Sequence, residues 1–494
     1  MPSNNPPIIA DAQPSGSARR VWLGVLAGAI VVGGVAAWYV ASQGLTLSHY
    51  DARGHLVVSR RVADSLTPGW RQFGAVWLPL PHLVNFIPSQ LDWAYRTGAI
   101  AVLLSIGFLA TGLAALAHRL FARTGSVAAA ITPAALMLAN PNVLYLQSTP
   151  MTEPTLIGLA LLSLAAVDEW IHAPSPAGRS RAAWLIAALM MTRYEGWLIA
   201  AGLAGIATIA AWRRGPREWE PLWLPSAIVV AAFLVLGYAA TGQWFLSASF
   251  FVPENPALHR PLVAAEQVFE GLKTLASPVV IAVAGAGAIV AIVRARWALP
   301  SLLPLALLFS AALPIVAFSA GHPFRVRYMV PLVAACAVLG GVAVAALPRR
   351  LRAAAAGVLF AAVVWTRPPW DMSAPMVTEA QWETPFRLAR QSVTRVLGEV
   401  HDGQPILASM GSLAHYMHET SAIGLNLRDF LHEGNGDLWA EALRDPRASV
   451  RWILIEERAE GGDMLAAIAR STPGFLGGFE RVAEGGGLVL YRRK

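Results

Sequence analysis

Long apolar stretches separated by short polar connections dominate the first three quarters of the chain. Each stretch approaches the length of about 20 residues that a helix needs to cross a bilayer. The two shortest, at 182–195 and 197–212, predict either a hairpin or one bent pair. The pattern therefore predicts about eleven transmembrane helices, at 21–41, 96–117, 127–145, 153–172, 182–195, 197–212, 222–240, 275–293, 298–318, 328–347 and 353–366.

The pattern changes after residue 366, where prolines and charged residues become frequent. Residues 382–400 have helical spacing, and 405–410 and 452–455 are short apolar runs typical of strands covered on both faces. Two helix-like stretches and a terminal hairpin follow, at 437–444, 463–470, 479–482 and 488–491. We therefore predict a small α/β domain at 367–494, long enough to fold alone.

Composition supports a membrane protein. Hydrophobic residues make up 55% and charged residues 14% of the 494 positions, whereas soluble domains average about 25% charged residues. The net charge of +8 is explained by basic cytoplasmic loops. No basic stripe marks a soluble domain, so we expect no nucleic-acid partner. The sequence also contains no Gly-rich loop with a lysine for binding nucleotide phosphates.

Basic residues sort the connections into two sets. If residues 1–20 form a cytoplasmic tail, all short loops predicted on the inside are basic, as membrane orientation requires. We therefore predict an integral protein, of a bacterial inner membrane, with a cytoplasmic N-terminus and a periplasmic or extracellular C-terminal domain. The basic residues are His118, Arg119, Arg123, Arg179, Arg181, Arg213, Arg214, Arg217, Arg294, Arg296, Arg349, Arg350 and Arg352.

The predicted outer loop 42–95 holds the densest polar cluster, within the transmembrane domain 21–366. Ionisable groups near a bilayer are costly and usually functional. Asp51 is the candidate catalytic base, since a carboxylate can take a proton from an acceptor as the new bond forms. The alternative is that Asp51 caps a short helix lying on the membrane. Neighbouring His49, Tyr50 and His82 are candidate substrate-binding residues.

Other polar residues stand at the outer ends of the predicted spans. Glu153 either caps a helix or serves as a second functional acid. Arg193 and Glu195 either bind substrate or only pair with each other. Arg325 and Arg327 enter a late span from the outside, where arginine can grip a lipid phosphate or snorkel to headgroups without specificity.

Two weaker signals carry no function at this stage. The arrangement His415…His418-Glu419 lacks the spacing of zinc-protease signatures, so no metal ligand is assigned. Gly285 and Gly287 lie within a span, where small residues favour close helix packing.

An enzyme on the outer face has no supply of nucleotide-activated substrate, so a sugar on a membrane-bound polyprenyl phosphate suits this arrangement. The residues also resemble the GT-C superfamily of integral-membrane glycosyltransferases, in particular the protein O-mannosyltransferase and aminoarabinose transferase branch. The similarity is in the architecture of 20–366, the Y-D at Tyr50-Asp51, the T-R-Y-E-G-W from Thr192, and the R-Y-M-V-P from Arg327.

The resemblance implies inverting transfer of a sugar from a polyprenyl-phosphate donor to a protein, lipid or glycan. Asp51 matches the family's catalytic aspartate, and Arg325, Arg327 and Tyr328 match the stretch that approaches the donor phosphate. Ala52 stands where many relatives carry a second acid, so the acidic metal-binding pair of the oligosaccharyltransferase branch is not implied. No cofactor is assigned, and a divalent metal remains open.

A transporter or flippase of a lipid-linked or anionic solute is the alternative function. It predicts charges at mid-span depth and paired broken helices in two related halves. The polar residues instead gather at one predicted face, beside which we expect a cavity for the lipid-linked sugar. A non-catalytic scaffold that displays the C-terminal domain leaves the polar outer loops unexplained.

Overall fold

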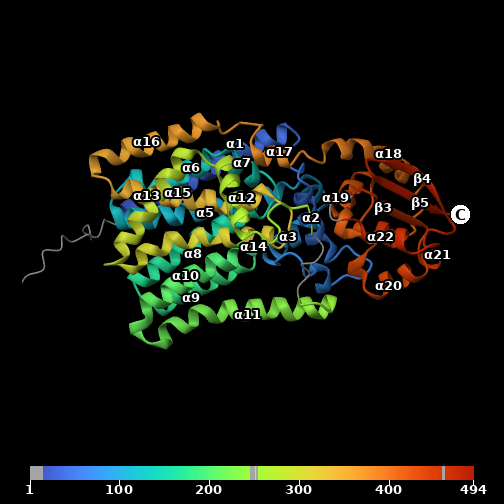
Figure 1. The fold of residues 1–494 in the computed structure, drawn as a ribbon, viewed down its shortest axis with the longest axis horizontal. Coiled ribbons are helices and arrows are strands. Elements are labelled where there is room, and N and C mark those ends of the chain that lie inside the picture. Colours follow the sequence, from blue (N-terminus) through green and yellow to red (C-terminus); the bar gives the residue numbers. More distant parts are fainter. Residues whose placement is uncertain (1–14, 245–250, 252–253, 459–461) are drawn as a thin grey trace, which may run out of the picture.

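A bundle of long helices and a smaller sheet-containing unit form the two ends of the molecule, with helix α2 between them (Figure 1). The computed structural model describes residues 15–244, 251, 254–458 and 462–494. Most of the predicted tail 1–20 therefore lies outside the described residues.

The bundle contains a helix or helix pair for every predicted apolar run. Its elements are α1 (Ser15–Ser42), α5 (Ala99–Thr124), α6 (Val127–Leu138), α7 (Pro141–Gln147), α8 (Glu153–His172), α9 (Pro176–Met190), α10 (Glu195–Ala211), α11 (Pro216–Thr241), α13 (Pro278–Ala295), η3 (Leu299–Ala311), α14 (Ala312–Ser319), α15 (Val330–Ala346) and α16 (Arg349–Thr366).

The predicted count of eleven spans is not confirmed. Within the described ranges, eight helices are long and apolar enough to cross a membrane, or nine if α6 and α7, bent by 73°, form one broken span. Helix α9 has 15 residues, and α16 has 18 residues and begins with the arginine-rich sequence RRLR. The segment 182–212, predicted as a hairpin or one bent pair, forms two helices, α9 and α10, separated by residues 191–194.

Glycines allow some helices to pack backbone against backbone. A Cβ added to Gly112 of α5 would lie 2.5 Å from the carbonyl oxygen of Gly158 in α8. A Cβ on Gly287 of α13 would collide with the carbonyl oxygen of Leu339 in α15. Gly287 thus serves close helix packing, as the sequence predicted, whereas a Cβ on Gly285 would meet open space.

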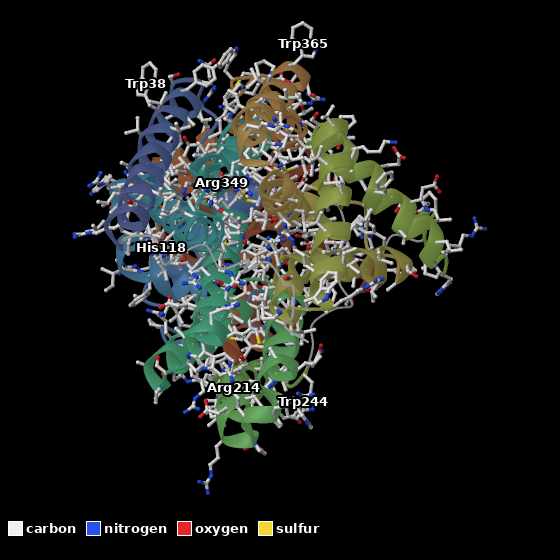
Figure 2. All side chains as sticks on the ribbon, turned by 90° about the vertical axis from the view of Figure 1, so that its left-hand side faces the viewer. Trp38, His118, Arg214, Trp244, Arg349 and Trp365 are labelled. Atoms are coloured by element: carbon white, nitrogen blue, oxygen red, sulfur yellow. The ribbon has the colours of Figure 1, made fainter. Side chains whose placement is uncertain are left out.

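Basic connections collect at the end of the bundle away from the sheet. The turns that follow α5, α10 and α15 lie there, and Figure 2, which views this end, labels His118, Arg214 and Arg349. The opposite end of the bundle carries α2 and the candidate site residues. The sorting of charge by end, predicted from the sequence, is therefore present in the fold.

The C-terminal unit is a five-stranded sheet in the order β2-β1-β3-β5-β4. Strand β1 pairs in parallel with β2 and β3, whereas β5 runs antiparallel to β3 and β4. The predicted strands, helices and hairpin all form. Elements that were not predicted include β2, α19, the short helices α17 (Pro375–Glu379) and α21, and three 3-10 helices at Thr420–Ile423, Leu427–Asp429 and Glu433–Asn435. The elements are α18 (Thr384–Val400), β1 (Ile406–Ala408), α19 (Met410–Glu419), β2 (Phe430–Leu431), α20 (Asp437–Arg444), α21 (Pro446–Ser449), β3 (Trp452–Glu456), α22 (Met464–Ser471), β4 (Phe479–Gly485) and β5 (Leu488–Arg493).

Shorter elements complete the fold around α2 (Tyr50–Arg61): η1 (Trp70–Phe73), α3 (Leu80–Ser89), α4 (Asp92–Thr97), η4 (Val326–Met329) and α17 (Pro375–Glu379). Helix α12 (Pro261–Leu275) packs against α14, η4 and α15. Helix α2 was expected to lie on the membrane surface, but its residues 51–60 are all buried. Leu56 and Val57 belong to the hydrophobic core that includes β1 and α19. The C-terminal unit covers the face of α2 that a membrane surface was expected to cover.

Candidate active site

Helix α2 begins with a histidine cap that directs Asp51 into the protein. The His49 Nδ1 atom accepts a hydrogen bond of 3.1 Å from the Asp51 backbone N–H, so the N-cap residue is His49. The alternative that Asp51 itself caps the helix is wrong. Asp51 occupies the first turn and is only 8% exposed.

The Asp51 carboxylate forms an ion pair with Arg327. Arg327 lies in η4, immediately before α15, and is 7% exposed. The same guanidinium lies 3.3 Å from His49 Nε2. The fold thus brings together the two residues that the sequence proposed as base and phosphate ligand.

The ion pair controls the charge of the carboxylate. Burial is the largest single influence and raises the pKa of Asp51, but the charge and hydrogen bond of Arg327, together with the charges of His49 and His55, outweigh burial and lower this pKa to about 2. Asp51 is therefore ionised at neutral pH. A carboxylate with so low a pKa is a weak base, and it becomes stronger only if Arg327 is drawn toward another anion.

Aromatic and acidic groups surround the pair. The Tyr50 ring stacks on His49 at a centroid distance of 4.8 Å, and Arg327 lies 6.0 Å from the centre of the Tyr50 ring. His49 Nε2 is 3.6 Å from Glu379 of α17. These contacts fix the orientation of His49 and Tyr50 toward Arg327.

A second buried ion cluster adjoins the first through Tyr328. The Tyr328 ring lies 5.6 Å from the guanidinium carbon of Arg327 and 6.0 Å from that of Arg193. Arg193 pairs with Glu195 at 2.8 Å and with the fully buried Glu153 at 2.9 Å. Arg193 and Glu195 do pair with each other, as one alternative proposed, but Glu153 joins them instead of acting as an exposed cap.

His82 and Arg325 lie at the margin of the site. His82 Nε2 is 3.1 Å from Nδ1 of His55, one helical turn after Asp51. Burial lowers the pKa of His82 to about 3, so this imidazole is neutral. The guanidinium carbon of Arg325 lies 5.6 Å from the ring centre of Trp382. The structure thus gathers the other predicted residues around Arg327 and Tyr328.

The pair is closed in this structure. We expected a cavity beside Asp51, whereas Asp51 and Arg327 are in direct contact. A cavity of about 700 Å³ lies instead among α1, α6 and α16, and its lining is almost wholly apolar.

A buried ionic network that was not predicted from the sequence holds α2 to the C-terminal unit. Arg53 and Arg390 both bind Glu383 and Glu419. Arg53 lies only two residues after Asp51, but its partners lie more than 300 residues away. The sequence contained one signal, an arginine on the apolar side of a short helix.

A histidine with two glutamates adjoins this network. His415, Glu383 and Glu456 bring one ligand atom each to within 4.8 Å of one another. Burial lowers the pKa of His415 to about 3. Burial, and then repulsion from Glu383, raises the pKa of Glu456 to about 7. No spacing in the sequence indicated this group.

Comparison with solved structures identifies the fold. The chain shares its fold with ArnT. Over 95% of this chain and 97% of the other, it superposes with a TM-score of 0.55 and 14% identity on ArnT from Cupriavidus metallidurans bound to undecaprenyl phosphate. The apo form of the same ArnT gives a TM-score of 0.52 and 17% identity over 97% and 98% of the two chains.

No family model matches the sequence, and no curated protein matches it. At such low identity, the likeness establishes the architecture of a polytopic membrane protein with a small C-terminal sheet. The predicted resemblance to the aminoarabinose transferase branch of the GT-C superfamily is thus confirmed at the level of fold.

Proposed function

We propose that this protein is an inverting glycosyltransferase that moves a sugar from a polyprenyl-phosphate-linked donor to an acceptor on the outer face of the membrane. The contact between Asp51 and Arg327 is the observation that carries the proposal. It places a carboxylate that can take the acceptor's proton next to a guanidinium that can bind the donor phosphate. The solved ArnT that binds undecaprenyl phosphate has the same fold, which supports this donor class.

In this mechanism the donor phosphate competes with Asp51 for Arg327. Arginine binds phosphate oxygens through two parallel hydrogen bonds, which makes it a strong phosphate ligand. Once Arg327 turns to the phosphate, the pKa of Asp51 rises, because burial then acts without the opposing charge. Donor binding therefore produces the base when it is needed.

Transfer then proceeds by a single displacement. A lone pair on the acceptor oxygen or nitrogen attacks the anomeric carbon while its proton passes to Asp51. The bond from the anomeric carbon to the phosphate oxygen breaks, and its electron pair leaves with the polyprenyl phosphate. Positive charge held in advance beside the leaving phosphate is usually the larger catalytic contribution. Attack opposite the phosphate inverts the anomeric configuration.

Arg325 and Tyr328 assist at the phosphate in this proposal, and Arg193, Glu153 and Glu195 line the sugar side. Tyr328 contacts both Arg327 and Arg193. A movement of Arg327 would therefore shift the Tyr328 ring and change its contact with Arg193. The side of the site formed by α2 is lined in this proposal by His49, Tyr50 and His82.

A transporter is less well supported. It would use ionisable groups at mid-span depth, with broken helices repeated in two halves. Among the described residues one bent pair, α6 and α7, meets the criterion for a broken span. The buried charges described above lie at one end of the bundle.

Binding of undecaprenyl phosphate to the purified protein in detergent tests the donor site. Arg327→Gln should weaken binding about tenfold or more, because a hydrogen bond to a charged group contributes about 1.5–3 kcal/mol. Arg428→Gln is the control, because Arg428 also pairs with a buried aspartate but is 64% exposed and lies outside the site. Equal affinity in wild type and Arg327→Gln would reject the assigned role of Arg327.

A further inference from the structure

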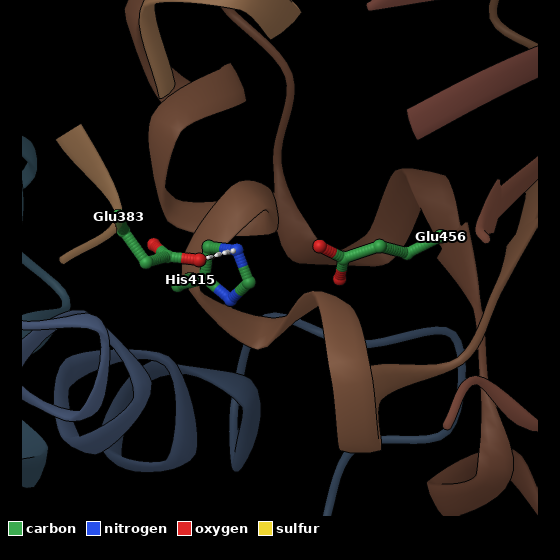
Figure 3. Close-up of side chains that lie close together, drawn as sticks. All are labelled: Glu383, His415 and Glu456. Carbon is green, nitrogen blue, oxygen red and sulfur yellow. Dashed lines mark ion pairs between the residues drawn. The ribbon is translucent and has the colours of Figure 1, made fainter. Parts of the chain in front are cut away.

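Three side chains of the C-terminal unit converge where its parallel strands end. Glu383 precedes α18, His415 lies in α19, and Glu456 is the last residue of β3 (Figure 3). Helix α19 begins two residues after β1, which pairs in parallel with β3. In open α/β sheets, ligands bind beyond the carboxyl ends of the strands. The three residues occupy this position.

We infer that Glu383, His415 and Glu456 form a binding site for one divalent transition-metal ion of the zinc or manganese class. A histidine with two carboxylates is a ligand set that suits such ions. The site lies outside the Asp51–Arg327 pair, and its existence does not depend on the proposed glycosyl transfer.

The geometry needs only a small adjustment. His415 Nε2 and Glu383 Oε1 are 3.2 Å apart, close to the distance of about 3.4 Å between two ligands of a tetrahedral zinc ion. All three ligand atoms lie within 4.8 Å of one another. The Glu456 carboxylate points toward His415 (Figure 3), and a side-chain movement of at most about 1.4 Å would complete a three-ligand shell.

His415 provides an independent observation. The residue is 6% exposed, and its buried Nε2 atom makes no hydrogen bond to any described residue. Buried polar atoms in proteins almost always have a partner. This nitrogen lies 3.2 Å from Glu383 Oε1 without the geometry of a hydrogen bond, and it faces the two carboxylates, so a metal ion between them would give it a directed ligand bond.

Neighbouring arginines hold the Glu383 carboxylate in one orientation, and the carboxylates of the group can still neutralise the charge of a cation. Glu383 Oε2 accepts hydrogen bonds from Arg53 and Arg390, at 3.0 and 3.3 Å, while Oε1 faces His415. Such outer partners commonly hold a metal-binding carboxylate in one orientation. The charges of these two arginines are balanced by Glu383 and Glu419, so Glu456 adds a further negative charge to the site once it is deprotonated.

A metal here would join the site to helix α2. Arg53 of α2 binds Glu383 directly, and the Tyr50 ring meets the His415 ring edge-on at 6.5 Å. An ion that fixes Glu383 and His415 would therefore hold the C-terminal unit against the helix that carries Asp51. The expected consequence is greater stability of the whole chain.

Metal binding by the chelator-treated, full-length protein in detergent tests the inference. Equilibrium dialysis against Zn²⁺, and separately against Mn²⁺, followed by elemental analysis should give one ion per chain for at least one metal. His415→Gln and Glu456→Gln should each weaken that binding by at least about 100-fold, because losing a ligand costs more than the 10–100-fold typical of losing a partner of a ligand. The metal should also raise the unfolding temperature of the wild type but not of these variants.

Glu457→Gln and His401→Gln are the matched controls. Glu457 is adjacent to Glu456 but is 49% exposed and pairs with Arg481. His401 bonds only to the Gln404 carbonyl among the described residues. Glu456→Gln keeps the size of the side chain, so a folding defect is not expected. The inference is overturned if neither metal binds stoichiometrically, or if His415→Gln and Glu456→Gln bind like the controls.

Discussion

Replacing Asp51 by asparagine separates its proposed catalytic role from its structural role. The substitution keeps the size of the side chain but removes the charge that Arg327 binds. Transfer should fall by about 10²–10⁴-fold, the usual contribution of a general base. Without the acid–base group the acceptor still binds but keeps its proton during attack.

The structural cost of the same substitution follows from the pKa of Asp51. The shift from 3.8 to about 2 corresponds to about 2 kcal/mol of stability at neutral pH. Because the folded pKa lies below the unfolded one, this stabilisation is present above about pH 4 and is lost as the pH falls through about 2. Asp51→Asn should remove this acid-dependent part of the stability, as measured by thermal unfolding across this pH range.

The assay should detect transfer without knowledge of the sugar. Release of undecaprenyl phosphate from a panel of radiolabelled undecaprenyl-phosphate-linked sugars, with membrane extract as the acceptor source, reports turnover for any sugar. Asp64→Asn is the matched control. Asp64 is 4% exposed and pairs with Arg60 at 2.9 Å, so its loss also disturbs a buried ion pair in the same loop.

Asp64→Asn should lose stability but keep its rate of transfer. If Asp51→Asn turns over donor at the wild-type rate, Asp51 acts only as the structural partner of Arg327. If both variants lose activity in parallel with their loss of stability, the assigned chemistry is equally wrong, because stability alone would then explain the rates.

Two further predictions concern packing and charge, both measured by thermal unfolding in detergent. Gly112→Ala should cost about 1–3 kcal/mol, since the added Cβ meets a carbonyl oxygen of α8 at 2.5 Å. Gly107→Ala on the same helix, where a Cβ has open space, should be neutral or stabilising by up to about 1 kcal/mol. Arg60→Gln removes a 9%-exposed partner of Asp64 and should cost about 3–5 kcal/mol. Arg428→Gln removes a 64%-exposed partner of the same carboxylate and should cost at most about 1 kcal/mol. If Gly112→Ala and Gly107→Ala changed the stability equally, the close packing of α5 against α8 would be contradicted. If Arg60→Gln and Arg428→Gln did so, burial would not explain the strength of the Asp64 ion pairs.

The sequence predicted secondary structure well because its signal is local. The helix found at Asp437–Arg444 has the predicted bounds, and the strand pairs formed where short apolar runs met turn residues. The span count was less certain, because length alone does not distinguish a crossing helix from the bent pair α6–α7. Strand β2, with two residues, was too short to leave a pattern.

The sequence by itself determined that the chain is a membrane protein, which of its loops are basic, and which residues are candidates for chemistry. Hydrophobicity, charge and side-chain type are properties of single positions, so they can be read without a fold. The identity of Asp51 and Arg327 as candidates came from this information.

Only the tertiary structure decided which of these residues meet. His49 and Arg327 are 278 positions apart and yet lie 3.3 Å from each other, and α2 has a hydrophobic face that suits a membrane and a protein core equally. Residues that pair in the fold are selected by burial and opposite charge. When such residues lie far apart along the chain, no repeating sequence pattern marks them as partners. For the same reason the group of Glu383, His415 and Glu456 emerged only when α18, α19 and β3 had been placed together.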